Sequence, residues 1–198
     1  MKDFSDMRQV DAQSQHIRRV FWVFRALADR MDACGGDSEE SALHLSGRIA
    51  AIGRVAVASP FFDAIDLELL VRDELRLHAA SPEQFSITGL EVRLVPRAAE
   101  LMSLALHELA TNSVKFGALC QSEAKIWILW DITDYFGSRV LQFEWSEAGV
   151  KMTAAPPLRG FGSELIERVI ARELKGEGKM TLLPDGVRCT IEIPLSDA

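Results

Sequence analysis

Polar side chains recur along a stretch of the chain that otherwise has the composition of a buried helix, HELATNSVKFGAL. They follow one another at intervals of three to four residues, so a helix would place them on one face while its opposite face packs. An acid, an amide and a base on one helix face suit a ligand that is anionic and chelated to a metal ion. A solvated helix face with one core histidine is the alternative. The residues are His107, Glu108, Thr111, Asn112 and Lys115.

The composition limits the classes of protein to consider. The chain has 198 residues, of which 48% are hydrophobic and 26% are charged, as in a folded globular protein. Its net charge of -7 argues against binding to nucleic acid, which needs a basic surface. Its three separated cysteines offer neither a disulfide framework nor a paired zinc-ligand pattern, and favour a reducing cytoplasm. No apolar run reaches the length of about 18 residues that a membrane span needs, so we expect a cytoplasmic protein with no membrane partner.

Residues 1–60 predict a helical hairpin. Apolar residues recur at helical spacing over residues 4–34, where proline and glycine are absent. The segment Gly35-Gly36-Asp37-Ser38 can end this helix and cap a second one over residues 39–59. Two long helices joined by so short a turn are antiparallel, and their apolar stripes can pair across a twofold axis. We therefore expect a homodimer in which two hairpins form a four-helix bundle.

Residues 61–198 predict an α+β domain, a mixed sheet with helices on one side. Proline, glycine and changes from helical to alternating apolar periodicity mark the boundaries of its elements. In order, they are a helix over residues 66–78 capped by Asp66, hairpin-like strand material over 85–95 around Gly89, the helix of the polar stretch beginning at Pro96, strands over 125–133 and 140–145, an irregular segment over 149–162, a helix over 163–174, and a hairpin over 179–195 with Asp185-Gly186 at its turn.

Three segments in this order resemble the ATP-binding domain of the HWE group of bacterial histidine kinases. They are HELATNSVKFGAL, which is similar to the N box, WSEAG, which is similar to the Trp-x-Glu box, and RGFGSELI, which is similar to the glycine-rich box. The resemblance covers nearly the whole chain and is strong from Glu100 to Ile166. It implies a Bergerat-type α/β sandwich after the helical hairpin, with ATP and Mg²⁺ as cofactors.

The resemblance also implies roles for the residues of the polar stretch. Asn112 would hold Mg²⁺ through its amide oxygen, and Lys115 would meet phosphate oxygens as a point charge. Glu108 would polarise or deprotonate the attacking group. His107 would belong to the group's distinctive N box.

The other two boxes are implied to hold the remainder of the nucleotide. Glu147, at the end of an apolar strand where side chains emerge at a sheet edge or pocket mouth, would accept the exocyclic amine of adenine. Trp145 would form a packing wall, or else be a core aromatic. The segment Gly160-Phe161-Gly162 would bring its backbone and a helix N-terminus close to phosphate. Residues 151–159 would form a lid, or else a surface loop.

The phosphoacceptor is expected on the first helix. HIRRVFWVFRALADR looks like a degenerate form of the group's phosphoacceptor segment and contains His16. The family pattern has an arginine after the histidine and an asparagine four residues on, where this chain has Ile17 and Val20. A structural histidine at the bundle seam is the alternative role of His16.

Three functions are compatible with these residues. The first is an ATP-dependent histidine autokinase that passes phosphate to an aspartate on a response-regulator receiver domain. The second is a histidine phosphotransferase with a decayed nucleotide site, and the third is a regulator that sequesters a partner without phosphoryl transfer. The polar set argues against a decayed site, because a site without a ligand has no need of buried polar groups. The altered residues around His16 keep the second and third functions open.

Overall fold

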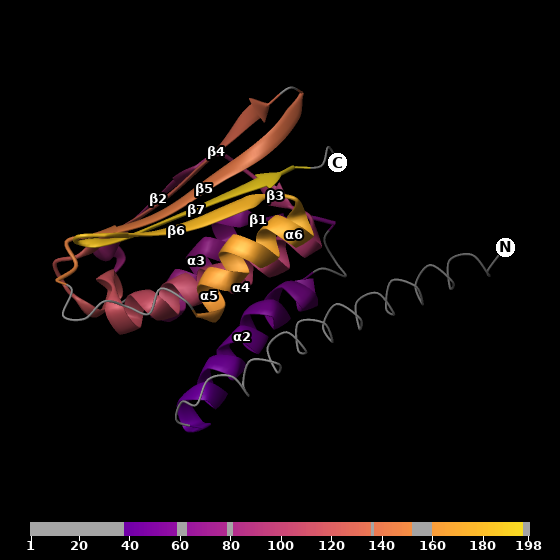
Figure 1. Ribbon diagram of the computed structural model, residues 1–198. Coiled ribbons are helices and arrows are strands. Elements are labelled where there is room, and N and C mark those ends of the chain that lie inside the picture. Colours follow the sequence, from indigo (N-terminus) through magenta and orange to yellow (C-terminus); the bar gives the residue numbers. More distant parts are fainter. Residues whose placement is uncertain (1–37, 59–62, 79–80, 136, 152–159, 196–198) are drawn as a thin grey trace. The chain divides into compact units, whose positions relative to one another are not determined.

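The computed structural model describes residues 38–58, 63–78, 81–135, 137–151 and 160–195 (Figure 1). The predicted first helix, His16 and most of the predicted lid lie outside the described residues. The second helix of the predicted hairpin is present as α2, Ser38–Ala58. Residues from Gly47 onward form one compact unit, and the contacts described below lie within it. That unit begins inside α2, whereas the sequence predicted a division after residue 60. The hairpin, its pairing into a dimer and the domain boundary remain predictions.

Helix α3, Leu67–His78, begins where the sequence predicted. Oδ1 of Asp66 accepts hydrogen bonds from the backbone nitrogens of Glu68, at 2.7 Å, and Leu69, at 3.2 Å. Two of the amides that a helix leaves without partners in its first turn are thereby satisfied. The helix then buries one apolar face, made of Leu67, Val71 and Leu75.

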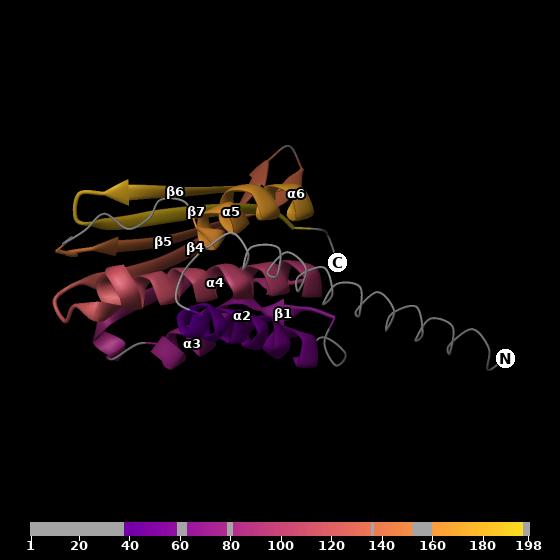
Figure 2. The same cartoon turned by 60° about the horizontal axis from the view of Figure 1, so that its bottom comes forward.

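Helix α4, Pro96–Phe116, carries the polar stretch and begins at a proline, as predicted. Proline is well suited to a first helical turn, because its missing N–H would have no partner there in any case. The helix is buried over most of its length, from Ala98 to Ala110. Figure 1 shows α3, α4, α5 and α6 on one face of the sheet, and Figure 2 shows the same arrangement after rotation.

The main sheet is mixed and has five strands in the order β2-β4-β5-β7-β6. Only β2 and β4 pair in parallel, and the other neighbours are antiparallel. Alternate residues of β4, β5 and β7 face the helices and form the core of the sheet, as the strand period of two requires. The α+β class predicted for this part of the chain is confirmed. The strands are β2 Phe85–Gly89, β4 Lys125–Tyr135, β5 Ser138–Ala148, β6 Glu177–Leu183 and β7 Gly186–Pro194.

The hairpin predicted over residues 85–95 around Gly89 is wrong. Residues 85–89 form β2, which pairs in parallel with β4, while β3, Arg93–Leu94, pairs with β1, Ile65–Asp66, in a separate two-stranded sheet. Gly89 ends β2 against the indole of Trp130, with which a Cβ at this position would collide. The indole Nε1 donates a hydrogen bond to the Leu90 carbonyl at 2.7 Å. Glycine is therefore needed here for close packing and not for a hairpin turn.

The C-terminal elements follow the predicted order. A helix begins as α5, Phe161–Glu164, passes through a π-helical turn, η3, Leu165–Val169, and ends as α6, Ile170–Leu174. It buries Leu165, Ile166 and Ile170. The predicted hairpin is formed by β6 and β7. Within the described part of the chain, no helix is long and apolar enough to cross a membrane.

The aspartate cap of α3 provides a test of this part of the fold. We expect Asp66→Ala to lower the free energy of unfolding by about 1 kcal/mol, because the first-turn amides lose their acceptor. Asp73→Ala is the matched control on the same helix, since it removes only an ion pair with the exposed Arg76, worth less than about 0.5 kcal/mol. Urea unfolding monitored by circular dichroism measures both. Equal effects of the two substitutions would contradict the capping role.

Candidate functional site

The polar face predicted on α4 is divided between the protein interior and the solvent. His107 is 8% exposed and Glu108 is 6% exposed, whereas Asn112 and Lys115 are exposed. The hydroxyl oxygen of Thr111 is buried and has no hydrogen-bond partner among the described residues. A simple solvated face with one core histidine does not describe this helix, because it also buries a carboxylate. Buried charges require partners, and those partners come from other elements.

Glu108 is held by an arginine that the sequence motifs did not identify. Nε of Arg48, on α2, donates to Oε1 of Glu108 at 2.6 Å, and a terminal guanidinium nitrogen donates to Oε2 at 3.0 Å. This two-point geometry matches the planar guanidinium to the planar carboxylate. The guanidinium carbon of Arg48 also lies 4.1 Å from the centre of the Phe161 ring. The feature of the sequence that distinguishes Arg48 is its charge within an otherwise apolar helical stripe.

The glycine-rich segment adjoins this ion pair. A Cβ placed on Gly162 would lie 3.1 Å from Cβ of Glu108 and 3.3 Å from its Oε2. The absence of a side chain at Gly162 therefore lets the start of α5 approach α4 closely. Gly160 precedes the helix and is exposed. Its backbone nitrogen donates a hydrogen bond to the Ser163 hydroxyl. The structure thus brings the predicted N box and glycine-rich box into contact.

The Trp-x-Glu segment contacts the turn that follows the C-terminal end of α4. Oε2 of Glu147 accepts a hydrogen bond from the Ala118 backbone nitrogen at 2.7 Å, and Oε1 accepts one from Nε1 of Trp145 at 2.9 Å. Both side chains were expected to emerge at a sheet edge or pocket mouth, but Trp145 is 1% exposed and Glu147 is 2% exposed. They lie at positions of β5 that face the helices. Trp145 is therefore a core aromatic, and both oxygens of Glu147 already have donors within the protein.

Burial determines the protonation of Glu147. It raises the pKa of this carboxyl above its ordinary value of 4.5, and the hydrogen bonds from Trp145 and Ala118, which favour the ionised form, offset only part of that effect. Contact between Glu147 and Gly117 leaves no space for a side chain at position 117. The carboxyl group therefore fastens β5 to the turn that follows α4.

His107 belongs to a third cluster, between α4 and α3. Its Nδ1 lies 2.7 Å from Oε1 of Glu74, and Nε2 of His78 lies 3.1 Å from the same oxygen. Arg54, on α2, pairs with Oε2 of Glu74. Burial raises the pKa of Glu74, but the hydrogen bonds from His107 and His78 and the positive charge of Arg54 outweigh it and lower the pKa to about 2. No motif in the sequence indicated that His78 or Glu74 would contact His107.

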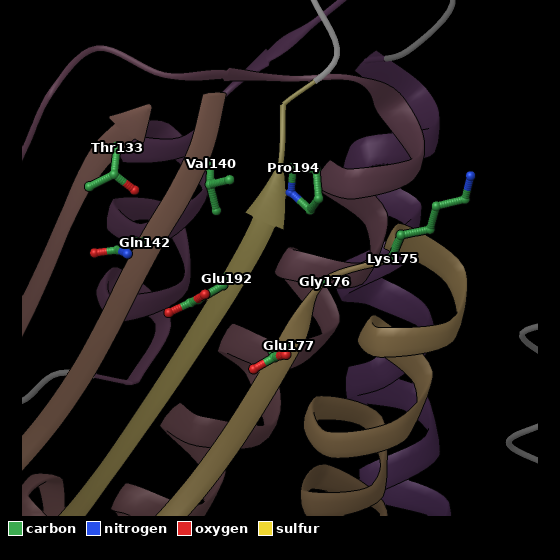
Figure 3. Close-up of a pocket in the computed structure, with 8 residues that line it drawn as sticks. All are labelled: Thr133, Val140, Gln142, Lys175, Gly176, Glu177, Glu192 and Pro194. Atoms are coloured by element: carbon green, nitrogen blue, oxygen red, sulfur yellow. The ribbon is translucent and has the colours of Figure 1, made fainter. Parts of the chain in front are cut away.

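The outer face of the sheet has a hollow that contains none of the predicted site residues. Gln142, Glu192 and Glu177 project into it from three neighbouring strands, with Lys175 at its rim (Figure 3). The helices cover the opposite face of the sheet, where α4 carries the N box and lies next to the other two motif segments. The candidate site is therefore on the helical side, around the exposed Asn112 and Lys115 and between the contacts at Glu108 and Glu147.

Known proteins are similar to this chain in sequence. The chain is 30% identical to blue-light-activated histidine kinase 1 of Erythrobacter litoralis over 95% of its own length and 53% of that protein. It is 33% identical to the blue-light-activated histidine kinase of Brucella anthropi over 55% of its length and 22% of that protein. The chain is related to these histidine kinases. It spans about half the length of the first of these relatives and a smaller part of the second. No family model matches the chain.

Solved structures agree with this relationship at the level of the fold. The blue-light-activated histidine kinase EL346 of Erythrobacter litoralis superimposes with a TM-score of 0.58 over 92% of this chain and 62% of that one, at 17% identity. Its isolated histidine kinase domain superimposes with a TM-score of 0.53 over 86% of this chain and 94% of that one, at 17% identity. The mixed sheet with helices on one face is therefore a fold that these histidine kinase structures share.

The ion pair between Arg48 and Glu108 provides a second test. We expect Arg48→Met to lower the free energy of unfolding by about 3 kcal/mol, because it leaves the Glu108 carboxylate buried without a counter-ion. The double variant Arg48→Met with Glu108→Gln should lose less, since no charge then remains to be compensated. Urea unfolding measures all three proteins.

The exposed pair of Arg72 and Glu68 supplies the control. Both side chains are nearly half exposed, and Arg72→Met should cost less than about 0.5 kcal/mol. If Arg48→Met costs no more than Arg72→Met, the pair at Glu108 does not stabilise the fold.

The raised pKa of Glu147 predicts a dependence of stability on pH. Its protonated form stabilises the folded protein fully below the unfolded pKa, and that contribution is lost as the pH rises through the higher folded pKa. Glu147→Gln does not titrate. In urea unfolding, the stability of wild type relative to this variant should therefore fall as the pH rises above the ordinary value of 4.5 and through the higher folded pKa. Ser146→Ala, a change without a titrating group on the same strand, should differ from wild type by a constant amount. A constant difference for Glu147→Gln as well would contradict the assignment.

Proposed function

We propose that the chain is the core of an ATP-dependent histidine autokinase, which transfers the γ-phosphoryl group of ATP to His16 and from there to a response-regulator aspartate. The observation that carries this proposal is the convergence of three distant segments on α4. Gly162 lies against Glu108 near the middle of the helix, and Glu147 is bonded to Ala118 just beyond its end. The exposed Asn112 and Lys115 lie between these contacts. Histidine kinases are similar to this chain in sequence and share its fold.

The residues around α4 fit a magnesium nucleotide. The amide of Asn112 is an oxygen ligand of the kind that Mg²⁺ prefers, and Lys115 supplies a cation for phosphate. The buried hydroxyl of Thr111, which has no hydrogen-bond partner among the described residues, is a further polar group on the same helix. Gly160, Phe161 and Gly162 would offer close backbone approach to phosphate. Mg²⁺, when bound, neutralises charge on the phosphates during transfer.

Two of the assigned residues need their present partners to change. Both oxygens of Glu108 are engaged by Arg48, so a role as base toward the His16 imidazole requires Arg48 to release one of them. Both oxygens of Glu147 accept hydrogen bonds, although a carboxyl oxygen can accept more than one. Adenine recognition by Glu147 would therefore add a hydrogen bond to an existing pair. These occupied carboxylates are the observation that favours the alternative of a regulator without phosphoryl transfer.

The assembly proposed for the kinase follows from the sequence. Two hairpins of residues 1–60 would pair into a four-helix bundle and form a homodimer, with residues 61–198 as the ATP-binding sandwich of Bergerat type. The partner would be a receiver domain, because a phosphohistidine donates its phosphoryl group to an aspartate in two-component signalling. We place this reaction in the cytoplasm, where ATP and a reduced thiol environment are both found.

Incubation of the full chain with γ-labelled ATP and Mg²⁺ tests the function. We expect protein-bound label that is lost in acid and survives base, because the product is a phosphoramidate. His16→Gln should abolish the label while nucleotide binding, measured by calorimetry, persists. His44→Gln is the matched control and should retain the label. Asn112→Ala should remove the metal-dependent part of nucleotide binding and the label with it.

The other outcomes discriminate between the alternatives. Undiminished label in His16→Gln would refute that residue as the phosphoacceptor. Intact nucleotide binding with no label in wild type would favour the sequestering regulator. Failure to bind nucleotide would favour a phosphotransferase with a decayed site.

A further inference from the structure

Three side chains with metal-ligating atoms meet between α3 and α4, at the cluster of Glu74, His78 and His107. One ligand atom from each lies within 4.8 Å of the other two. Glu74 and His78 project from successive turns of α3, and His107 projects from α4. Glu74 and His107 are buried, while the side chain of His78 retains 23% of its exposure. The cluster thus has a closed side and an opening to solvent.

We propose that Glu74, His78 and His107 form a binding site for a divalent transition metal ion of the zinc class, separate from the Mg²⁺ of the nucleotide. Two imidazoles and one carboxylate are a ligand set that zinc uses when its fourth position is left to water. Imidazole selects zinc and its neighbours over Mg²⁺, which prefers oxygen ligands. The partly exposed His78 marks the side from which the ion and its water would enter.

The distances in the cluster are close to those that a tetrahedral ion needs. With bonds of about 2.0 to 2.1 Å, ligand atoms around zinc are about 3.3 Å apart. Oε1 of Glu74 now lies 2.7 Å from Nδ1 of His107 and 3.1 Å from Nε2 of His78. Small side-chain movements would admit the ion. It would then replace the hydrogen bonds of the cluster, with His107 protonated at Nε2 and His78 at Nδ1.

The surroundings of the cluster are those of an outer ligand shell. Arg54, on α2, pairs with Oε2 of Glu74, which leaves Oε1 for the metal and fixes the plane of the carboxylate. Its positive charge opposes a cation, but its side chain is 35% exposed, so water screens that repulsion. On the same element, Gly47 lies against the His107 ring, where a Cβ would be 2.5 Å from Nε2.

Titration of the metal-stripped full chain with Zn²⁺, followed by calorimetry, tests the site. We expect one ion per chain, and a melting temperature that rises with Zn²⁺, falls again with a chelator and does not respond to an equal concentration of Mg²⁺. His78→Ala should weaken Zn²⁺ binding at least tenfold and abolish the rise in melting temperature. This variant alters the most exposed ligand, so circular dichroism should find it folded.

The chain offers a matched control in its two other histidines. A protein with His16→Gln and His44→Gln should bind Zn²⁺ as the wild type does. Substitution of Co²⁺ should give the visible bands of a tetrahedral ion without thiolate charge transfer, which distinguishes the cluster from adventitious binding at cysteines. Absence of binding in the wild type, unchanged binding in His78→Ala, or loss of binding in the control would each overturn the proposal.

Discussion

The structure depends on the partners of the ionisable side chains that α4 buries in the interior. A helix that is buried over most of its length should be apolar, yet this one contains Glu100, His107 and Glu108 below 10% exposure. Each of these groups is paired with a different element. Glu108 is bonded to Arg48 on α2 and His107 to Glu74 on α3, while Arg97 connects Glu100 to Glu173 on α6. Since an unpaired buried charge costs several kcal/mol, these pairings fix where each neighbour of α4 can lie.

Because these pairings use only part of the polar face of α4, the exposed part of that face can contact a ligand. Glu108 and His107 already have partners within the protein, so the part of the polar face that they form is structural in this conformation. Asn112 lies about one turn and Lys115 about two turns further along, and both are exposed. The helix therefore presents an amide and a cation at a position held by ion pairs on one side and by the Glu147 carboxyl on the other. A rigid support of this kind reduces the entropy lost when a polyanionic ligand binds.

The contact of Arg48 with both Glu108 and Phe161 joins elements that are remote in sequence. Arg48 lies on α2, the second helix of the predicted dimerisation hairpin. Glu108 belongs to the N box, and Phe161 belongs to the glycine-rich box. A guanidinium can satisfy a carboxylate through its edge and an aromatic ring through its face at the same time, which lysine cannot do. These three segments therefore converge on one side chain that no motif had marked.

The sequence by itself determined the local elements and the relationship of the chain. Asp66 and Pro96 mark the starts of α3 and α4 because caps and prolines act on the adjacent backbone, and the apolar periods distinguish helices from strands for the same local reason. The N box, the Trp-x-Glu box and the glycine-rich box also indicated the histidine kinase relationship. Tertiary structure alone decided the partners. It placed β2 parallel to β4, although the alternation around Gly89 suited a hairpin equally well, and it buried Glu147 against Ala118. It also joined Arg48 to Glu108 across 60 residues and His107 to Glu74 across 33. Such pairings depend on which surfaces meet when helices pack on a sheet, and no periodicity within a single segment contains that information.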